Sequence, residues 1–209
     1  MKKQIKAETI ANTIVSAFTA RREAFKSMVD AGIKPVVSSE YSTIAKRIDG
    51  QSFIATIDKV RTMFDLQYFT RAIGNVEKKS GNDSDYMQLK SIEKVLKFFE
   101  AIALNDYKKL DGYTYYLLYN TLKNAGSLNA QACFITLSKR SMSEDEISVV
   151  IKKFMNATPG TASTQTSSTK ELLRCLGLTN HAKGQREVGI ELTIDAQALI
   201  AEHFNSLAA

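Results

Sequence analysis

Residues 158–177 read TPGTASTQTSSTKELLRCLG, and this stretch determines how the second half of the chain is interpreted. Eight of its first twelve residues are Ser or Thr. Near its end, Ser168 and Glu171 have the spacing of a capping box, in which a serine hydroxyl and a glutamate three residues later bind the free N–H groups of a helix start. We therefore expect a polar segment that leads into a short helix, with Gly177 as its stop.

Downstream, residues 187–194 read EVGIELTI and alternate between apolar and polar side chains. This alternation predicts a strand and is the one period-two signal in the chain. Its apolar face would consist of Val188, Ile190, Leu192 and Ile194. Asp195 is placed to cap a final helix that contains Ile200 and Phe204.

Upstream, we expect two helices, one from Ser127 to Arg140 and one opened by a second capping box, at 143–146, and ending near 158–160. The resulting order over 127–194 is helix, helix, polar turn, short helix, basic loop and strand. This order resembles a winged helix-turn-helix module in architecture, although no family motif accompanies it. Residues 176–179 are the partner available for the predicted strand.

In such a module the recognition helix enters the major groove with its N-terminal residues, and the wing reaches the DNA backbone. Small hydroxyl side chains and basic side chains suit these positions, because they approach and bind phosphate oxygens. The residues that we expect to contact nucleic acid are Thr166, Ser167, Thr169, Lys170, Arg174, Lys183, Arg186, Lys152 and Lys153. The alternative is a flexible Ser/Thr-rich linker followed by a short helix and an edge strand.

The first half of the chain carries apolar residues at three- and four-residue spacings, which predicts amphipathic helices. The expected helices span residues 7–31, 42–49, 52–73, 85–104 and 112–124, with an exposed loop at 77–85. Gly32, Gly50 and Gly126 are the expected stops. The predicted fold is therefore mainly α: a helical bundle over 1–126, for oligomerisation or partner docking, and a winged-helix-like part with one short strand or hairpin over 127–209.

The chain carries a formal net charge of +6, and the charge is unevenly distributed. Residues 147–186 hold six basic residues and one acidic residue, whereas residues 187–209 hold four acidic residues and neither Lys nor Arg. A basic protein favours acidic partners. We expect nucleic acid, and DNA rather than RNA, although a solvated basic face beside a chance acidic tail would give the same counts.

Additional contacts are expected from the first half of the chain. Arg21, Arg22 and Lys26 form a basic group, and Arg22 and Lys26 share a helix face. Five of the eight tyrosines fall within 107–119, beside several lysines, and Tyr113 and Tyr116 are candidates for stacking on bases. The alternative is a half-buried helix whose tyrosines pack with their hydroxyl groups at the rim of the core.

The motifs that are absent argue against an enzyme and a cofactor. The sequence has no glycine-rich phosphate loop, no GxSxG elbow and no HExxH motif. Its two histidines and two cysteines lack metal-ligand spacing, so we expect no metal site and two unpaired thiols. Such sparse cysteines are typical of a reducing, cytoplasmic setting, and the sequence shows neither a signal peptide nor a membrane span.

The predicted function is that of a non-enzymatic accessory or regulatory protein that binds nucleic acid, with the bundle available for homo-oligomerisation. The alternative is a helical structural or interaction protein whose positive charge serves an acidic protein partner. Salt dependence separates the two, because each phosphate contact adds a defined slope to the dependence of affinity on salt concentration.

Overall fold

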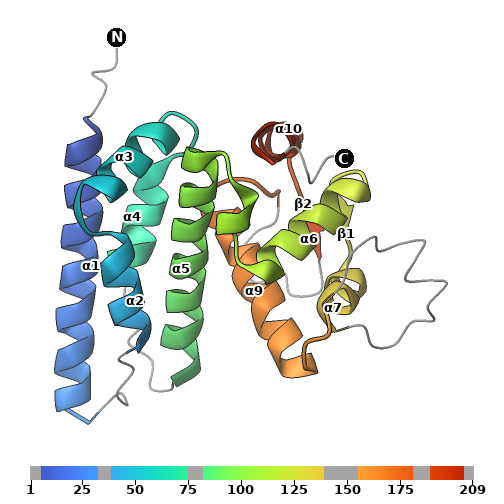
Figure 1. Cartoon of the computed structure of the whole chain (residues 1–209). Coiled ribbons are helices and arrows are strands. Elements are labelled where there is room, and N and C mark those ends of the chain that lie inside the picture. Colours follow the sequence, from blue (N-terminus) through green and yellow to red (C-terminus); the bar gives the residue numbers. More distant parts are fainter. Residues whose placement is uncertain (1–5, 33–38, 75–81, 139–154, 181–188, 205–209) are drawn as a thin grey trace. The chain divides into compact units, whose positions relative to one another are not determined.

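The structure is a computed structural model of the 209-residue chain and describes residues 6–32, 39–74, 82–138, 155–180 and 189–204. The described residues are mainly helical, as predicted (Figure 1). None of their helices is both long enough and apolar enough to cross a membrane. The chain divides into two compact units, Met1–Ala103 (unit 1) and Leu104–Ala209 (unit 2).

Unit 1 is built from helices. They are α1 (Ala7–Asp30), α2 (Ser39–Arg47), α3 (Gly50–Val60), α4 (Leu66–Gly74) and α5 (Asn82–Leu104). Helix α1 buries Ile14, Phe18 and Phe25 on one side, at the spacing expected of an amphipathic helix, and packs against α3 and α4. The predicted long helices at 7–31 and 85–104 are thereby confirmed.

One predicted helix in unit 1 is wrong. The helix expected over 52–73 is two helices, because the chain turns between Val60 and Leu66. At this turn Phe64 packs on the rings of Phe98 and Phe99 in α5, with centroids 6.1 and 5.8 Å away, and the Asp65 carboxylate accepts a hydrogen bond from the Gln67 N–H. The first interaction depends on residues far away in the sequence, and the second depends on the local geometry of the turn. Helical periodicity in the sequence indicates neither of them.

Other unit 1 boundaries also shift. Gly50, expected to end a helix, begins α3 with φ +72°. Residues 82–85 of the expected loop belong to α5, while residues 77–81 lie outside the described residues.

Polar side chains join α5 to the other helices of unit 1. Arg47 in α2 donates from Nη1 to both oxygens of Glu100, at 2.7 and 2.8 Å. The fully buried Arg21 in α1 donates from Nε to the Tyr41 hydroxyl at 3.3 Å and from Nη2 to Gln88 Oε1 at 3.0 Å. These bonds fix the register of three helices around a shared apolar core.

Unit 2 mixes helices with short extended segments. In chain order it contains a 3₁₀ turn η1 (Tyr107–Lys109), α6 (Gly112–Lys123), β1 (Ser127–Leu128), α7 (Ala130–Ser138), α9 (Pro159–Cys175), β2 (Ile190–Glu191) and α10 (Ile194–His203). Helix α6, which we expected in the N-terminal bundle, packs against α7, α9 and β1. The two units therefore divide at Ala103/Leu104 and not at the expected 126/127.

The segment around β2 lies between two other extended segments. On one side, β2 pairs antiparallel with β1, and the Leu192 N–H donates to the Gly126 carbonyl at 2.8 Å. On the other side, Thr179 forms a bridge with Leu192, and the Thr193 N–H donates to the Leu178 carbonyl at 3.1 Å. Of residues 176–179, the segment available as a partner for the predicted strand, Thr179 forms this one bridge. The pairing with β1 was not predicted, because Ser127 had been assigned to a helix.

The start of α9 differs most from the sequence prediction. Thr158 caps α9, accepting from the Thr161 N–H at 3.3 Å, and Pro159 occupies the first helical position. Residues 159–169, for which a polar segment was predicted and a flexible linker was the alternative, are thus helical. The predicted cap Ser168 lies inside α9, where its hydroxyl donates to the Gln165 carbonyl at 3.1 Å. The predicted stop at Gly177 is correct, with φ +68°.

Two further caps are displaced from the expected residues. Asn129, and not Ser127, accepts from the third N–H of α7, at 2.8 Å from the Ala132 nitrogen. Thr193, and not Asp195, caps α10, and Ile194 is 84% exposed instead of facing the core. Ser, Thr, Asn and Asp have similar capping preferences, so the sequence did not distinguish between neighbours. The capping box at 143–146 lies outside the described residues.

Gly189 provides a test of the sheet. A Cβ atom at this position would lie 1.7 Å from the Leu128 carbonyl oxygen and 2.4 Å from the Asn129 carbonyl carbon. Gly189→Ala must therefore separate β2 from β1, and we expect it to lower the free energy of unfolding by about 1–3 kcal/mol. Urea denaturation followed by circular dichroism measures the change.

The matched control is Gly160→Ala in the first turn of α9, where a Cβ atom would meet nothing within 4 Å. This change should be neutral or slightly stabilising. Equal stability of the two variants would contradict the close approach of the backbones at Gly189.

A second test concerns Glu93 in α5. Burial raises the pKa of its carboxyl group, but Lys97 at 2.8 Å and Lys90 at 3.4 Å outweigh burial, and the pKa lies below its ordinary value of 4.5. The ion pairs therefore stabilise the fold above the pKa of the unfolded chain, and this stability is lost as the pH falls through the lower folded pKa.

We expect Glu93→Gln to lower the free energy of unfolding at neutral pH by about 0.5–1 kcal/mol, the sum of two such pairs. The difference from the unmodified protein should shrink as the pH is lowered below about 4.5. Thermal unfolding from pH ~3 to ~7, with the exposed Glu23→Gln as control, measures it. A pH-independent difference would rule out the ion pairs as the cause.

Candidate nucleic-acid interface

The candidate interface is one side of α9, which we call the α9 face and define as Ser163, Ser167, Lys170 and Arg174. These residues follow one another at three- and four-residue spacings and therefore lie on one side of the helix. Ser163 and Ser167 are exposed, and Lys170 and Arg174 are half-buried. The opposite side packs against α6 and α7.

The expected contact residues sit in the second half of α9, and not at its N-terminus. The N-terminal turn is formed by residues that follow Thr158. The partial positive charge of a helix N-terminus acts within the first turn, so it does not reach Ser167 or Lys170. Any phosphate bound at the α9 face would be held by side chains alone.

Thr169 does not belong to the exposed surface. Its side chain is fully buried, and its hydroxyl lies 3.3 Å from the hydroxyl of Thr114 in α6. Thr169 therefore contributes to the packing of α6 on α9, which removes it from the residues available to a base edge.

Thr166 lies at the border of the α9 face and the core. Its residue is half-buried, and its hydroxyl oxygen has no hydrogen-bond partner in the described part of the chain. A buried hydroxyl without a partner costs free energy.

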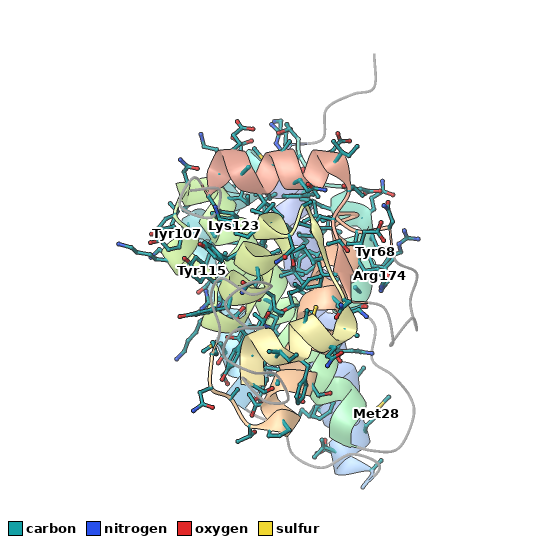
Figure 2. All side chains as sticks on the ribbon, turned by 90° about the vertical axis from the view of Figure 1, so that its right-hand side faces the viewer. Met28, Tyr68, Tyr107, Tyr115, Lys123 and Arg174 are labelled. Carbon is teal, nitrogen blue, oxygen red and sulfur yellow. The ribbon has the colours of Figure 1, made fainter. Side chains whose placement is uncertain are left out.

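Arg174 already binds a carboxylate. Its Nε donates to Glu171 Oε2 at 2.8 Å and its Nη2 donates to Glu171 Oε1 at 2.5 Å, a bidentate pair one turn apart on α9 (Figure 2 labels Arg174). A phosphate would have to compete with Glu171 for this guanidinium group. Because Glu171 is the single acidic residue between 147 and 186, it has a strong influence on the charge of the α9 face.

Lys170 is also only partly accessible, because its ammonium group is partly buried near Cys133. Burial lowers the pKa of its ammonium group, and the nearby Cys133 would oppose that effect if its thiol were ionised. The lysine is half-buried, so part of its side chain remains at the surface of α9. The α9 face thus offers one partly accessible lysine and one arginine paired within the helix.

The other predicted contacts separate into three groups. Lys152, Lys153, Lys183 and Arg186 lie outside the described residues. Arg22 and Lys26 are exposed on α1, as a phosphate contact requires. Arg21 is fully buried and binds Tyr41 and Gln88, so it serves the packing of unit 1 and not its surface.

The ring contacts of α6 do not centre on Tyr113 and Tyr116, the two tyrosines that the sequence analysis named as candidates for stacking. Tyr113 and Tyr116 are half-buried, but the contacts centre on Tyr115, whose ring stacks with Tyr107 at 5.3 Å and lies 6.2 Å from Tyr119. Tyr116 meets Tyr115 edge-on at 5.5 Å. The four-residue spacing of Tyr115, Tyr119 and Lys123 was the available signal for this arrangement.

Among the residues that the structure describes, no group of three His, Cys, Asp or Glu side chains could hold a metal ion. Both cysteines are buried free thiols, and Cys133 is fully buried in α7. Comparison with known proteins gave no significant match to a protein-family model, to a curated protein or to a solved structure.

The chemistry of Cys133 can be tested directly. Burial raises the pKa of its thiol to about 12, more than Lys170 lowers it, so the reactive thiolate is scarce at neutral pH. In a Cys175→Ser variant we expect the remaining thiol to resist a disulfide reagent in the native state and to react fully in denaturant. Rapid labelling of the native variant would contradict the buried placement of Cys133.

Proposed function

We propose that the chain is a non-enzymatic nucleic-acid-binding protein in which unit 2 acts as a winged-helix-like module. In this proposal the α9 face meets duplex DNA, and the segment between Thr179 and β2 is the wing. The role would be accessory or regulatory, because the proposal assigns binding and no chemistry.

The observation that carries the proposal is the bridge between Thr179 and Leu192. It pairs the chain segment that follows α9 with β2, so residues 180–189 connect two antiparallel segments. In a winged module, two paired segments follow the recognition helix and the wing connects them. The sequence between Thr179 and β2 contains Lys183 and Arg186, which suit contacts with the DNA backbone.

The chain order of unit 2 gives further support. In the part of unit 2 that the structure describes, the order is α6, β1, α7, α9, the extended segment at Thr179, and β2. Because β2 lies between β1 and Thr179, the sheet joins the start of α7 to the end of α9. Helices α6 and α7 pack against α9, and Ser163 and Ser167 of the α9 face are exposed.

The distribution of charge supports a weaker, sequence-independent contribution from unit 1. Unit 1 holds 17 Lys/Arg against 12 Asp/Glu, a net charge of +5, whereas unit 2 holds 11 against 10, a net charge of +1. The general attraction for a polyanion therefore arises mainly in unit 1, where Arg22 and Lys26 are exposed. The same observation favours the second candidate, a helical interaction protein that binds an acidic protein through unit 1.

The two candidates differ in what changes at the α9 face should do. For duplex DNA we expect Lys170→Ala/Arg174→Ala to weaken binding to all sequences and to lower the slope of log affinity against log salt by about two. The control, Lys59→Ala/Arg71→Ala, removes the same charge from exposed positions of unit 1. Fluorescence anisotropy at two salt concentrations measures both quantities.

A change of opposite sign sharpens this test. Glu171→Gln removes the carboxylate that binds Arg174 and should strengthen duplex binding, because the guanidinium becomes available to phosphate and a repelling charge is lost. If Lys170→Ala/Arg174→Ala and Glu171→Gln both bind DNA with the affinity and salt slope of the unit 1 control, the α9 face is not the interface. Binding of an acidic protein with no binding of DNA would establish the second candidate.

A further inference from the structure

We propose that unit 2 carries a second binding surface, which takes the unpaired bases of single-stranded nucleic acid. We call it the tyrosine ladder and define it as Tyr107, Tyr115, Tyr119 and Lys123. Figure 2 shows Tyr107, Tyr115 and Lys123 on the same side of the unit. The proposal goes beyond duplex binding by the α9 face and does not depend on it.

Two aspartate caps create the ladder. The Asp106 carboxylate accepts from the Lys108 N–H at 3.0 Å and holds η1 in its turn. The Asp111 carboxylate accepts from the Thr114 N–H at 3.1 Å and starts α6 directly afterwards. The two caps hold η1 and the start of α6 on either side of Leu110, and the ring of Tyr107 in η1 stacks on Tyr115 in α6 with an interplanar angle of 27°.

The ladder occupies the outer side of α6. Tyr115, Tyr119 and Lys123 are four residues apart and half-buried, whereas Leu117 and Leu118 on the inner side are fully buried. Helix α6 packs through that inner side on α7 and α9. The tyrosines are therefore not the core stripe of an amphipathic helix, since other residues of α6 supply the core.

The chemistry of the ladder fits a strand of unpaired nucleotides. Aromatic rings offer faces on which unpaired bases stack, and positive charges beside the rings follow the phosphates. Because Tyr107 and Tyr115 already stack on each other, the proposal places the bases on the outer faces of the ladder. Lys123 Nζ lies 5.7 Å from the centre of the Tyr119 ring at one end. At the other end Lys108 and Lys109 are exposed beside Tyr107, so positive charge flanks the rings on both sides.

The lysines favour nucleic acid over a protein partner. Tyrosine is enriched in protein–protein interfaces as well as in single-strand binding sites, but lysine is depleted from the former. Three lysines around three tyrosines therefore match a polyanion better than a protein surface. A duplex is a poorer fit, because its bases are stacked on one another and do not offer their faces.

The test compares Tyr115→Leu/Tyr119→Leu with Tyr115→Phe/Tyr119→Phe in the full-length chain. Leucine keeps apolar volume but removes the ring, and phenylalanine keeps the ring but removes the hydroxyl group. The probe is a labelled oligothymidylate of about a dozen nucleotides, within the range of known single-strand site sizes. We expect the leucine variant to lose about fivefold to 150-fold in affinity for each base no longer stacked, and the phenylalanine variant to bind nearly normally.

A second probe separates stacking from charge. An abasic oligonucleotide of the same length keeps the phosphates and should bind the unmodified protein more weakly than oligothymidylate does. The leucine variant should show no such preference for bases. Because the chain contains no tryptophan, tyrosine fluorescence also reports stacking, and oligothymidylate should quench it less in this variant than in the control Tyr68→Leu in unit 1.

Three outcomes would overturn the proposal. The first is equal affinity of the leucine and phenylalanine variants for oligothymidylate, and the second is equal affinity of the unmodified protein for the abasic probe and for oligothymidylate. The third is loss of self-association in the leucine variant while its binding of DNA is unchanged. The last outcome, seen by sedimentation, would identify a protein interface. If the leucine variant does not fold, Lys123→Glu at the half-buried end of the ladder must weaken oligothymidylate binding instead, and unchanged binding would refute the proposal.

The result is independent of the α9 face. Lys170→Ala/Arg174→Ala should keep its affinity for oligothymidylate, while the leucine variant should keep its affinity for duplex DNA. Duplex binding by the α9 face and single-strand binding by the tyrosine ladder can therefore be tested separately, and the failure of one proposal does not affect the test of the other.

Discussion

The close approach of Gly189 to Leu128 and Asn129 is the constraint on which unit 2 depends. A side chain at Gly189 has no room, because the backbone atoms of Leu128 and Asn129 occupy that space. The approach lets Leu192 bond to Gly126 on one side while Thr193 bonds to Leu178 on the other. The segment around β2 is joined in this way to the chain after α6 and to the chain after α9.

Several basic side chains are buried or bound to other side chains of the protein, so the net charge overstates the positive charge available at the surface. Arg21 is buried in unit 1, where it donates hydrogen bonds to Tyr41 and Gln88. Arg174 is held by Glu171, and Lys170 is partly withdrawn from solvent beside Cys133. An interface for a polyanion therefore has to be argued from accessible basic side chains, such as the exposed Lys108 and Lys109 beside the tyrosine ladder.

The Ser/Thr-rich segment shows how a polar sequence can form a helix with one buried side. Hydroxyl groups inside a helix can donate to a carbonyl of the preceding turn, as Ser168 does to Gln165 and Thr121 does to Leu117. Their small volume then allows α6 and α9 to approach, and Thr114 and Thr169 meet at 3.3 Å. Composition alone favours a linker for such a segment, because it reports polarity and not the partner that each hydroxyl finds.

By itself, the sequence determined the mainly helical class, the long helices α1 and α5, the stop at Gly177 and the strand around Ile190, since these depend on local periodicity and on glycine. The tertiary structure alone decided the break at Phe64, the start of α9 at Thr158, the pairing of β2 with β1 and the burial of Arg21 and Thr169. Each of these depends on a contact between residues far apart in the chain or on a choice between equivalent caps. For the same reason the sequence named Tyr113 and Tyr116, whereas the tertiary structure centred the ring contacts on Tyr115: the stacking of Tyr107 requires the turn that Asp106 and Asp111 impose.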